Sequence, residues 1–223
     1  MNTFHFFISF ALFSSIAKVG ESTEEAAPYA PVQFNDVNLE AAIRAALPKP
    51  EGAIVRKDMG GLGSLLGVRR GITDLKGLEY AKNLTYLSLH TNKISDLTPL
   101  ARLTKLNRLY LHNNRIANLR PLANLKNLVD LHLSRNQISE IAPLEGLTKM
   151  EKLDLTGNQV ADTRPLSRMI NLKTLWLDRN RIVDTTPLSG LGNLTSLTLY
   201  SNRISAVQKA ALKKALPKSR ILF

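Results

Sequence analysis

The apolar residues from Leu84 onward recur in one fixed pattern. In the unit that starts at Leu84, the leucines at its fourth and sixth places, Leu87 and Leu89, alternate with polar residues. This alternation is typical of a half-buried β-strand. Five further full units follow at equal intervals of 22 residues, beginning at Leu106, Leu128, Met150, Leu172 and Leu194, and a degenerate unit precedes them at Leu62. Residues 62–215 are therefore predicted to consist of one repeated structural unit.

Two other residue types keep the same interval. Asparagine occupies the ninth place of the six full units and proline the sixteenth place of five of them, at Asn92, Asn114, Asn136, Asn158, Asn180, Asn202, Pro99, Pro121, Pro143, Pro165 and Pro187. The asparagine amide is expected to bond to backbone groups where the chain turns inward. Proline cannot donate to a ladder of hydrogen bonds, so we expect an irregular outer segment. In the degenerate unit Arg70 stands where asparagine belongs.

The units must stack, because one unit of this size cannot bury its own apolar side chains. Their strands are then parallel and about 4.8 Å apart. Both ends need a cap. Residues 34–61 are predicted to cap the N-terminal end with a helix that begins behind Asp36 and buries Leu39, Ile43 and Leu47. At the other end we expect a closing helix over 208–216 and a cap strand within 216–223.

The unit L-x-x-L-x-L-x-x-N-x-I-x-x-L-x-P-L-x-x-L resembles the leucine-rich repeats of bacterial internalin-like proteins. Repeats of this length also occur in an intracellular regulator of protein phosphatases. Residues 34–47 are similar to the α-cap that opens the bacterial members, although Gly60, Gly61 and Gly63 make the first turn unusually rich in glycine. The resemblance implies an α/β fold: a leucine-rich-repeat solenoid, a right-handed horseshoe arc with a concave parallel β-sheet, a helical N-cap and a C-terminal helix–strand cap. It also implies protein binding on the concave sheet, and it identifies no ligand.

An apolar run near the N-terminus indicates export. Residues 4–17 have the length of a signal-peptide core and are short for a membrane span. Ser15 and Ala17 are the small residues that a signal peptidase reads, although no Lys or Arg precedes the run. We expect a signal peptide at 1–20, a flexible linker at 21–33, and a secreted or extracytoplasmic protein. An uncleaved membrane anchor and a cytoplasmic location are the alternatives.

Side chains at the third, fifth and seventh places of each unit, among them Ser88 and Thr198, are expected to point into solvent on the concave face. These rows hold the only Trp, three of the five Tyr and three of the four His of the chain. Aromatic rings with a polar edge are typical interface anchors, and β-propensity alone does not explain the histidines. The predicted ligand-binding residues, including Arg179 at the edge, are Tyr86, His90, Arg108, Tyr110, His112, His132, Lys152, Asp154, Trp176, Asp178, Arg179 and Tyr200.

Charges on this face indicate the chemistry of the partner. Asp130, Asp154 and Asp178 are 24 residues apart, which predicts a diagonal acidic stripe. The tenth place of each unit is basic or an amide, and the formal net charge is +12. Because Lys and Arg occur on every face of the unit, nucleic acid is a poor candidate. A protein surface that is mainly acidic fits better.

Several kinds of chemistry are disfavoured. The chain has no Cys, which excludes disulfides, thiol nucleophiles and Cys-based zinc sites. Diagonal carboxylates lie roughly 8 Å apart and cannot converge on calcium. His90 and His112 lack further zinc ligands. Ser134, His132 and Asp154 resemble a catalytic triad without an oxyanion hole. We therefore expect no enzyme, no cofactor and no metal site.

The leading expectation is a monomeric, exported, non-catalytic protein-binding module. One alternative is an intracellular regulatory scaffold of the phosphatase-regulator kind, and another is a binder of an acidic cell-surface polymer such as an acidic glycan. Membrane contact is expected only through an uncleaved N-terminal segment. Two sequons, at Asn83 and Asn193, matter only where exported proteins are glycosylated.

Overall fold

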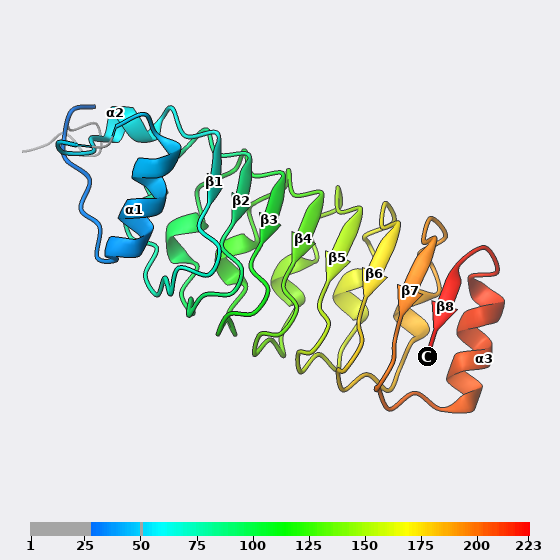
Figure 1. Ribbon diagram of the computed structural model, residues 1–223. Coiled ribbons are helices and arrows are strands. Elements are labelled where there is room, and N and C mark those ends of the chain that lie inside the picture. The colour runs from blue at the N-terminus through cyan, green and yellow to red at the C-terminus, as the bar shows by residue number, and fades with distance from the viewer. Residues whose placement is uncertain (1–27, 50) are drawn as a thin grey trace, which may run out of the picture.

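The computed structural model describes residues 28–49 and 51–223, so the expected signal peptide and the linker before residue 28 lie outside the described residues. Eight short strands form one parallel sheet in chain order (Figure 1). They are β1 (Ser64–Leu66), β2 (Tyr86–Ser88), β3 (Arg108–Tyr110), β4 (Asp130–His132), β5 (Lys152–Asp154), β6 (Thr174–Trp176), β7 (Ser196–Thr198) and β8 (Arg220–Leu222).

The strand register follows the sequence repeat. From β1 to β7 each residue pairs with the residue 22 places later, as Leu65 with Leu87 and Leu87 with Leu109. The last pair shifts by two, because Leu197 lies opposite Ile221. The central leucine of each repeat strand is at most 1% exposed, so one core runs through the whole stack. The predicted α/β solenoid is confirmed, and its degenerate first unit forms β1.

The repeated asparagines join consecutive units. Asn114 donates from Nδ2 to the carbonyls of Leu111 in its own unit (2.9 Å) and Leu89 in the preceding one (3.1 Å). Its Oδ1 accepts a hydrogen bond from the backbone N–H of Ile94 (3.0 Å). The other five asparagines make equivalent bonds, so the predicted backbone role of this residue is confirmed.

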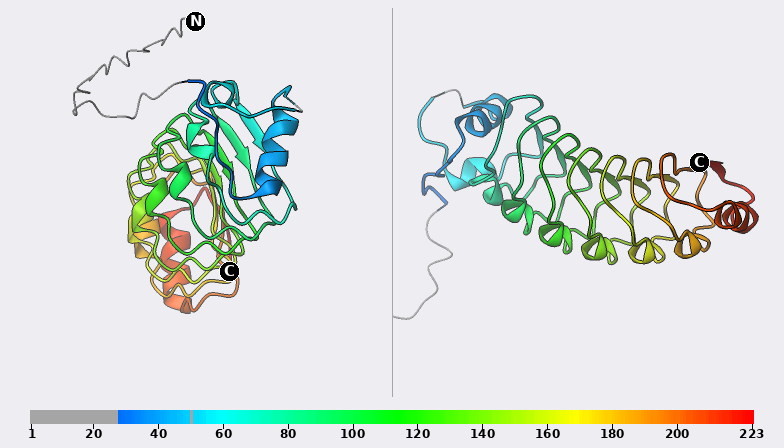
Figure 2. Two further views of the ribbon diagram at one scale, coloured as in Figure 1. Left: turned by 90° about the vertical axis from the view of Figure 1, so that its left-hand side faces the viewer. Right: turned by 90° about the horizontal axis from the view of Figure 1, so that it is seen from below.

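The outer side of each unit is more regular than expected. Instead of an irregular segment it forms a single turn of 3₁₀ helix, and the prediction of irregularity was wrong. These turns are η2 (Leu78–Tyr80), η3 (Thr98–Leu100), η4 (Arg120–Leu122), η5 (Ala142–Leu144), η6 (Arg164–Leu166) and η7 (Thr186–Leu188). In η3 to η7 proline occupies the first turn, where its fixed φ suits a helix and its missing N–H costs nothing. The 3₁₀ turns trace the convex side, opposite the strands (Figure 2, right).

A helix covers the N-terminal edge of the sheet. Helix α1 (Val37–Ala46) begins after Asp36, whose Oδ1 accepts from the backbone N–H groups of Asn38 and Leu39 at 2.9 and 3.0 Å. Its other oxygen accepts from the N–H and hydroxyl of Thr73 in the first unit, at 2.7 and 2.9 Å. The predicted helical cap is therefore tied to the repeats through one carboxylate. A four-residue helix, α2 (Arg56–Met59), follows.

The C-terminal end is closed by helix α3 (Ala206–Ala215) and strand β8. The helix begins two residues before the expected start at residue 208, because Ser205 caps it and accepts from the N–H of Gln208 (3.2 Å). The side-chain oxygen of Gln208 accepts from both the N–H and the hydroxyl of Thr185 in the preceding unit. Within residues 28–49 and 51–223, no helix has the length and apolar character needed to span a bilayer.

Candidate binding site on the concave face

Each of the strands β1 to β7 presents two side chains on the concave face, on either side of a buried leucine. In β4, for example, Asp130 and His132 flank the buried Leu131. Most of the predicted side chains on this face are half-buried or exposed. Ser88 and Thr198 are exceptions, at 2% and 8% exposed, so the expectation that they face solvent was wrong. The hydroxyl of Thr198 donates to the carboxylate of Asp178 in the preceding unit.

Four aromatic side chains form a chain of ring contacts across the sheet. The rings of Tyr86 and Tyr110 meet edge to face with centroids 5.5 Å apart. The ring of His132 lies 4.8 Å from that of Tyr110 and 5.7 Å from that of Trp176. We call Tyr86, Tyr110, His132 and Trp176 the aromatic ladder. At the N-terminal end of the ladder, the guanidinium of Arg108 lies 5.5 Å over the ring of Tyr86, within cation–π range.

His132 sits between two carboxylates. Its Nε2 is 2.9 Å from Oδ1 of Asp130, and its Nδ1 is 3.7 Å from Oδ2 of Asp154. Burial alone lowers the pKa of a histidine, but the two carboxylates outweigh burial and raise the pKa of His132 to about 9. The ring is therefore a cation at neutral pH, held in the middle of the aromatic ladder.

The two acids are stabilised as carboxylates. Burial works to raise the pKa of Asp130, but hydrogen bonds from His132 and Tyr110 hold it below its usual range. The pKa of Asp154 is lowered in the same way, by His132 and by the backbone N–H of Thr156. The hydroxyl of Tyr110 donates to Asp130 at 2.9 Å, and burial together with this bond raises the pKa of Tyr110 to about 12.

His90 and His112 form a separate pair. Their rings stack at 4.1 Å with an interplanar angle of 14°. Burial, and then the neighbouring His90, lower the pKa of His112 to about 4, and burial together with Arg69 lowers the pKa of His90. Both rings are therefore neutral at pH 7. Stacked rings direct their nitrogen lone pairs in parallel planes, and no cluster of three metal-ligating side chains occurs in the part of the chain that the structure describes.

Ser134, His132 and Asp154 do not have the order that nucleophilic catalysis needs. Nδ1 of His132 lies 3.7 Å from Oδ2 of Asp154, which is longer than a hydrogen bond, so this carboxylate does not orient the ring as a triad requires. Both ring nitrogens of His132 face carboxylates, so neither is directed at the serine hydroxyl. A general base must reach the proton that it removes.

The remaining predicted residues lie at the margins of this cluster. Asp178 accepts hydrogen bonds from the hydroxyl of Thr198 and from the backbone N–H of Tyr200 (2.7 Å). The side chain of Tyr200 is 45% exposed and has no ring contact with the aromatic ladder. Lys152 and Arg179 are exposed. The structure thus brings together the ladder, Arg108 and Asp154, and leaves the others as separate features.

A shallow hollow of about 270 Å³ opens beside the ladder. Its lining includes His132, Asp154 and Trp176, and also Arg135 and Thr156, which were not predicted from the sequence. Arg135 holds the eighth place of its unit, as Arg179 does, so the same row could have identified it. Asp130, placed in the acidic stripe but not among the binding residues, contacts two members of the ladder: it accepts from the hydroxyl of Tyr110 and lies 2.9 Å from Nε2 of His132.

The eighth place of every unit adopts a left-handed backbone conformation. The residues and their φ angles are Arg69 (54°), Thr91 (59°), Asn113 (55°), Arg135 (53°), Gly157 (68°), Arg179 (54°) and Ser201 (55°). Glycine, and to a lesser degree asparagine, suits this region, and other residues lose roughly 1–2 kcal/mol there. The conformation is enforced by the backbone, because the N–H at this place bonds to the next unit, as Arg135 does to Thr156 (2.7 Å).

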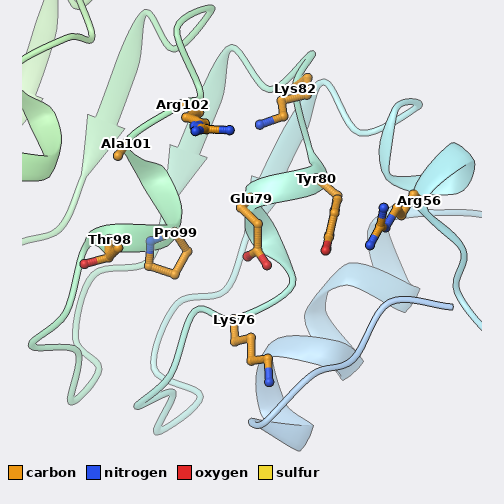
Figure 3. Close-up of a pocket in the computed structure, with 9 residues that line it drawn as sticks. All are labelled: Arg56, Lys76, Glu79, Tyr80, Lys82, Thr98, Pro99, Ala101 and Arg102. Atoms are coloured by element: carbon orange, nitrogen blue, oxygen red, sulfur yellow. The ribbon is translucent and has the colours of Figure 1, made fainter. Parts of the chain in front are cut away.

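A larger hollow, about 670 Å³, lies away from the concave face, between α2 and the first two convex turns. Figure 3 shows Arg56 beside Tyr80, with Glu79 and Lys76 nearby. The guanidinium of Arg56 lies 4.5 Å over the ring of Tyr80, and Glu79 accepts from the backbone N–H of Gly77. Four cations and one acid line this open hollow, and it contains none of the predicted binding residues.

Known protein families match the repeats. The family described as Leucine Rich repeats (2 copies) matches residues 104–146 and 126–168, and the one described as Leucine Rich Repeat matches residues 171–194. The solved structure of an internalin C2 from Listeria monocytogenes is 34% identical, with a TM-score of 0.68, and the match covers 89% of this chain and 98% of that one. The chain belongs to the internalin-like leucine-rich repeat proteins. The resemblance stated from the sequence is confirmed.

Two further structures extend the comparison. An internalin (inlF) from Listeria monocytogenes is 33% identical with a TM-score of 0.81, over 89% of this chain but only 59% of the internalin. A leucine-rich repeat protein from Leptospira interrogans is 26% identical with a TM-score of 0.57, over 66% of this chain and 45% of that protein. No curated protein sequence matches. Leucine-rich repeat proteins are commonly protein-binding modules, and internalin-like members are generally non-catalytic.

Proposed function

We propose that this chain is an exported, non-catalytic module that binds a protein partner on its concave sheet. The observation that carries the proposal is the aromatic ladder. It combines two tyrosines and one tryptophan with His132 on one open surface. Tyrosine and tryptophan dominate the binding energy of many protein interfaces. Export is inferred from the apolar segment at residues 4–17.

The ladder is also held in place before any ligand arrives. Ring contacts orient each member, and the carboxylates of Asp130 and Asp154 fix Tyr110 and His132. Side chains that are ordered beforehand lose less entropy on binding. Arg108, Lys152 and Arg179 surround the ladder as steering charges for a partner that is mainly acidic.

The test is partner capture by the full-length chain and by a double variant, Tyr86→Ala with Trp176→Ala. Neither of these side chains makes a side-chain hydrogen bond within the described residues, so their removal leaves the carboxylates of the site paired. Partners are captured from extracts, identified by mass spectrometry and titrated in purified form. We expect the double variant to weaken binding at least 100-fold, corresponding to about 2.7 kcal/mol.

A matched control is Ile170→Ala with Val183→Ala. These apolar side chains are each 57% exposed but lie outside the concave rows. The control is expected to bind like the unaltered chain. Undiminished binding by the Tyr86 and Trp176 double variant would remove the ladder from the interface.

A further inference from the structure

Three of the seven left-handed positions carry arginine, at Arg69, Arg135 and Arg179. The fold does not require arginine there, because Asn113 and Gly157 occupy the same place in other units and are better suited to it. A residue kept in an unfavourable conformation points to a role for its side chain.

These side chains extend a basic edge. The tenth place of other units, two residues further along, holds Arg115 and Arg203, and in the unit of Arg179 it holds Arg181; all three are also exposed. Backbone hydrogen bonds to the preceding unit fix this second row, as from the N–H of Arg181 to Val160 (2.9 Å). We call these six arginines the basic rim. Among the residues that the structure describes, no acid lies within 4.0 Å of a rim guanidinium as an ion pair.

The acids nearest to the rim in sequence are already engaged. On the concave side, Asp154 accepts from the backbone N–H of Thr156 and lies 3.7 Å from Nδ1 of His132, and Asp178 accepts from Thr198 and Tyr200. On the outer side, four aspartates each accept from the backbone N–H two residues further on: Asp74, Asp96, Asp162 and Asp184. These aspartates keep their negative charge, but none of them forms an ion pair with a rim guanidinium, so the six guanidinium groups stay open to a ligand.

We propose that the basic rim binds an acidic segment of the protein partner that docks on the concave sheet, an inference that rests on the proposed function. Arg135 lines the same hollow as His132 and Trp176, so one ligand reaches the rim and the aromatic ladder together. The fifth unit has Gly157 and Gln159 at the two rim places. This gap in the positive charge suits a folded partner better than an evenly charged polysaccharide.

The experiment uses the full-length chain and the double variant Arg135→Gly with Arg179→Gly. Fluorescein-labelled poly-L-glutamate is the acidic-peptide probe and heparin is the polysaccharide probe, both followed by fluorescence anisotropy at about 0.05 and 0.15 M salt. We expect the Kd for poly-L-glutamate to rise about tenfold. We also expect the Tm to rise by about 2–4 °C per substitution, because glycine adopts positive φ freely.

Two matched controls separate charge from backbone conformation. Thr91→Gly with Ser201→Gly changes the same place in two uncharged units, and should raise the Tm while leaving the Kd unchanged. Arg135→Lys with Arg179→Lys keeps both charge and conformation, and should keep the Kd within about twofold.

Three results would overturn the proposal. They are an unchanged Kd for poly-L-glutamate in the Arg-to-Gly double variant, a fall in its Tm, or a loss of heparin binding without a loss of poly-L-glutamate binding. The last result would assign the rim to a polysaccharide. Failure of the concave site would appear instead as intact partner capture by the Tyr86 and Trp176 double variant, so the two proposals can fail separately.

Discussion

At the scale of single residues, His132 sets the charge of the candidate site. It is the one histidine of the concave face that carries a positive charge at neutral pH, because it lies between two carboxylates. His112, in the preceding unit, is neutral because it is buried beside another histidine. Of the three imidazoles on consecutive units, only that of His132 is charged, and their surroundings alone account for the difference.

This contrast predicts two widely separated titrations. By ¹H–¹⁵N NMR of the imidazole nitrogens, His132 should titrate near pH 9 and His112 near pH 4. The raised pKa of His132 means that its contribution to stability is complete below about pH 6.5 and is lost as the pH rises through about 9. The depressed pKa of His112 has the opposite sign, since stability is lost as the pH falls from about 6.5 towards 4.

Substitution of one carboxylate checks the cause. Asp130→Asn removes the closest charge from His132 and should move its pKa down towards the ordinary value, while His112 changes little. A His132 that titrates near 6.5 in the unaltered chain would contradict the ion-pair geometry.

At the scale of elements, the N-terminal cap depends on Asp36. One of its oxygens begins α1 and the other holds Thr73 of the first unit. Burial works to raise the pKa of Asp36, but backbone bonds from Thr73 and Leu39 keep it below its usual range. Its contribution to stability is therefore present above about pH 4 and lost as the pH falls below that value.

Asp36→Ala should lower the free energy of unfolding by about 2–3 kcal/mol, because it leaves several N–H donors without an acceptor. Urea titration at pH 7 measures the loss. Asp96→Ala is the control, since Asp96 accepts only from Thr98 on an exposed convex turn. Asp96→Ala should lower the free energy of unfolding by at most about 1 kcal/mol. Equal costs for the two variants would show that the link between cap and repeats adds nothing.

The elements also show how far the sequence leads. Period-two leucines predicted the strands, and Asp36 predicted the start of α1, because both signals are local. The 3₁₀ turns around the prolines were not predicted. Proline has no N–H to donate to a strand, but this alone does not determine which other conformation the segment adopts. The start of α3 at Ala206 depended on a single serine cap.

For the candidate site, alternation placed Tyr110, His132 and Trp176 on one face correctly. It could not give the burial of Ser88, which depends on the sizes of its neighbours, or the positive φ of Arg135. Backbone bonds between units impose that φ, and the side chain offers no sign of it.

At the scale of the whole molecule, the asparagines couple one turn of the solenoid to the next. Asn158 donates to Leu155 in its own unit and Leu133 in the one before, and accepts from the N–H of Ile138. In a linear stack, stability is a sum of units and of the interfaces between them. One weakened interface therefore divides the stack.

Asn158→Ala should lower the free energy of unfolding by about 3 kcal/mol or more, because buried backbone groups lose their partners. It should also separate unfolding into two steps. The fluorescence of Trp176 reports the C-terminal part and circular dichroism reports the whole chain, so the two guanidinium curves should diverge. Asn193→Ala, which removes one exposed bond to Ile170 (2.8 Å), should keep them coincident. Coincident curves for both variants would indicate a stack that unfolds as one unit.

Each asparagine reaches backward, to the turn before its own. Arg70 stands in that place in the first turn, which has no earlier strand to bond among the described residues. The solenoid is therefore directional, because every turn after the first bonds to the preceding turn through the same set of asparagine hydrogen bonds. Removing or duplicating a complete 22-residue turn would leave complementary turns in contact. Inserting or deleting a single residue would instead shift the strand register and break these hydrogen bonds. Duplication of whole turns in the gene can therefore lengthen the solenoid, and enlarge its concave surface, while the packing of its core stays the same.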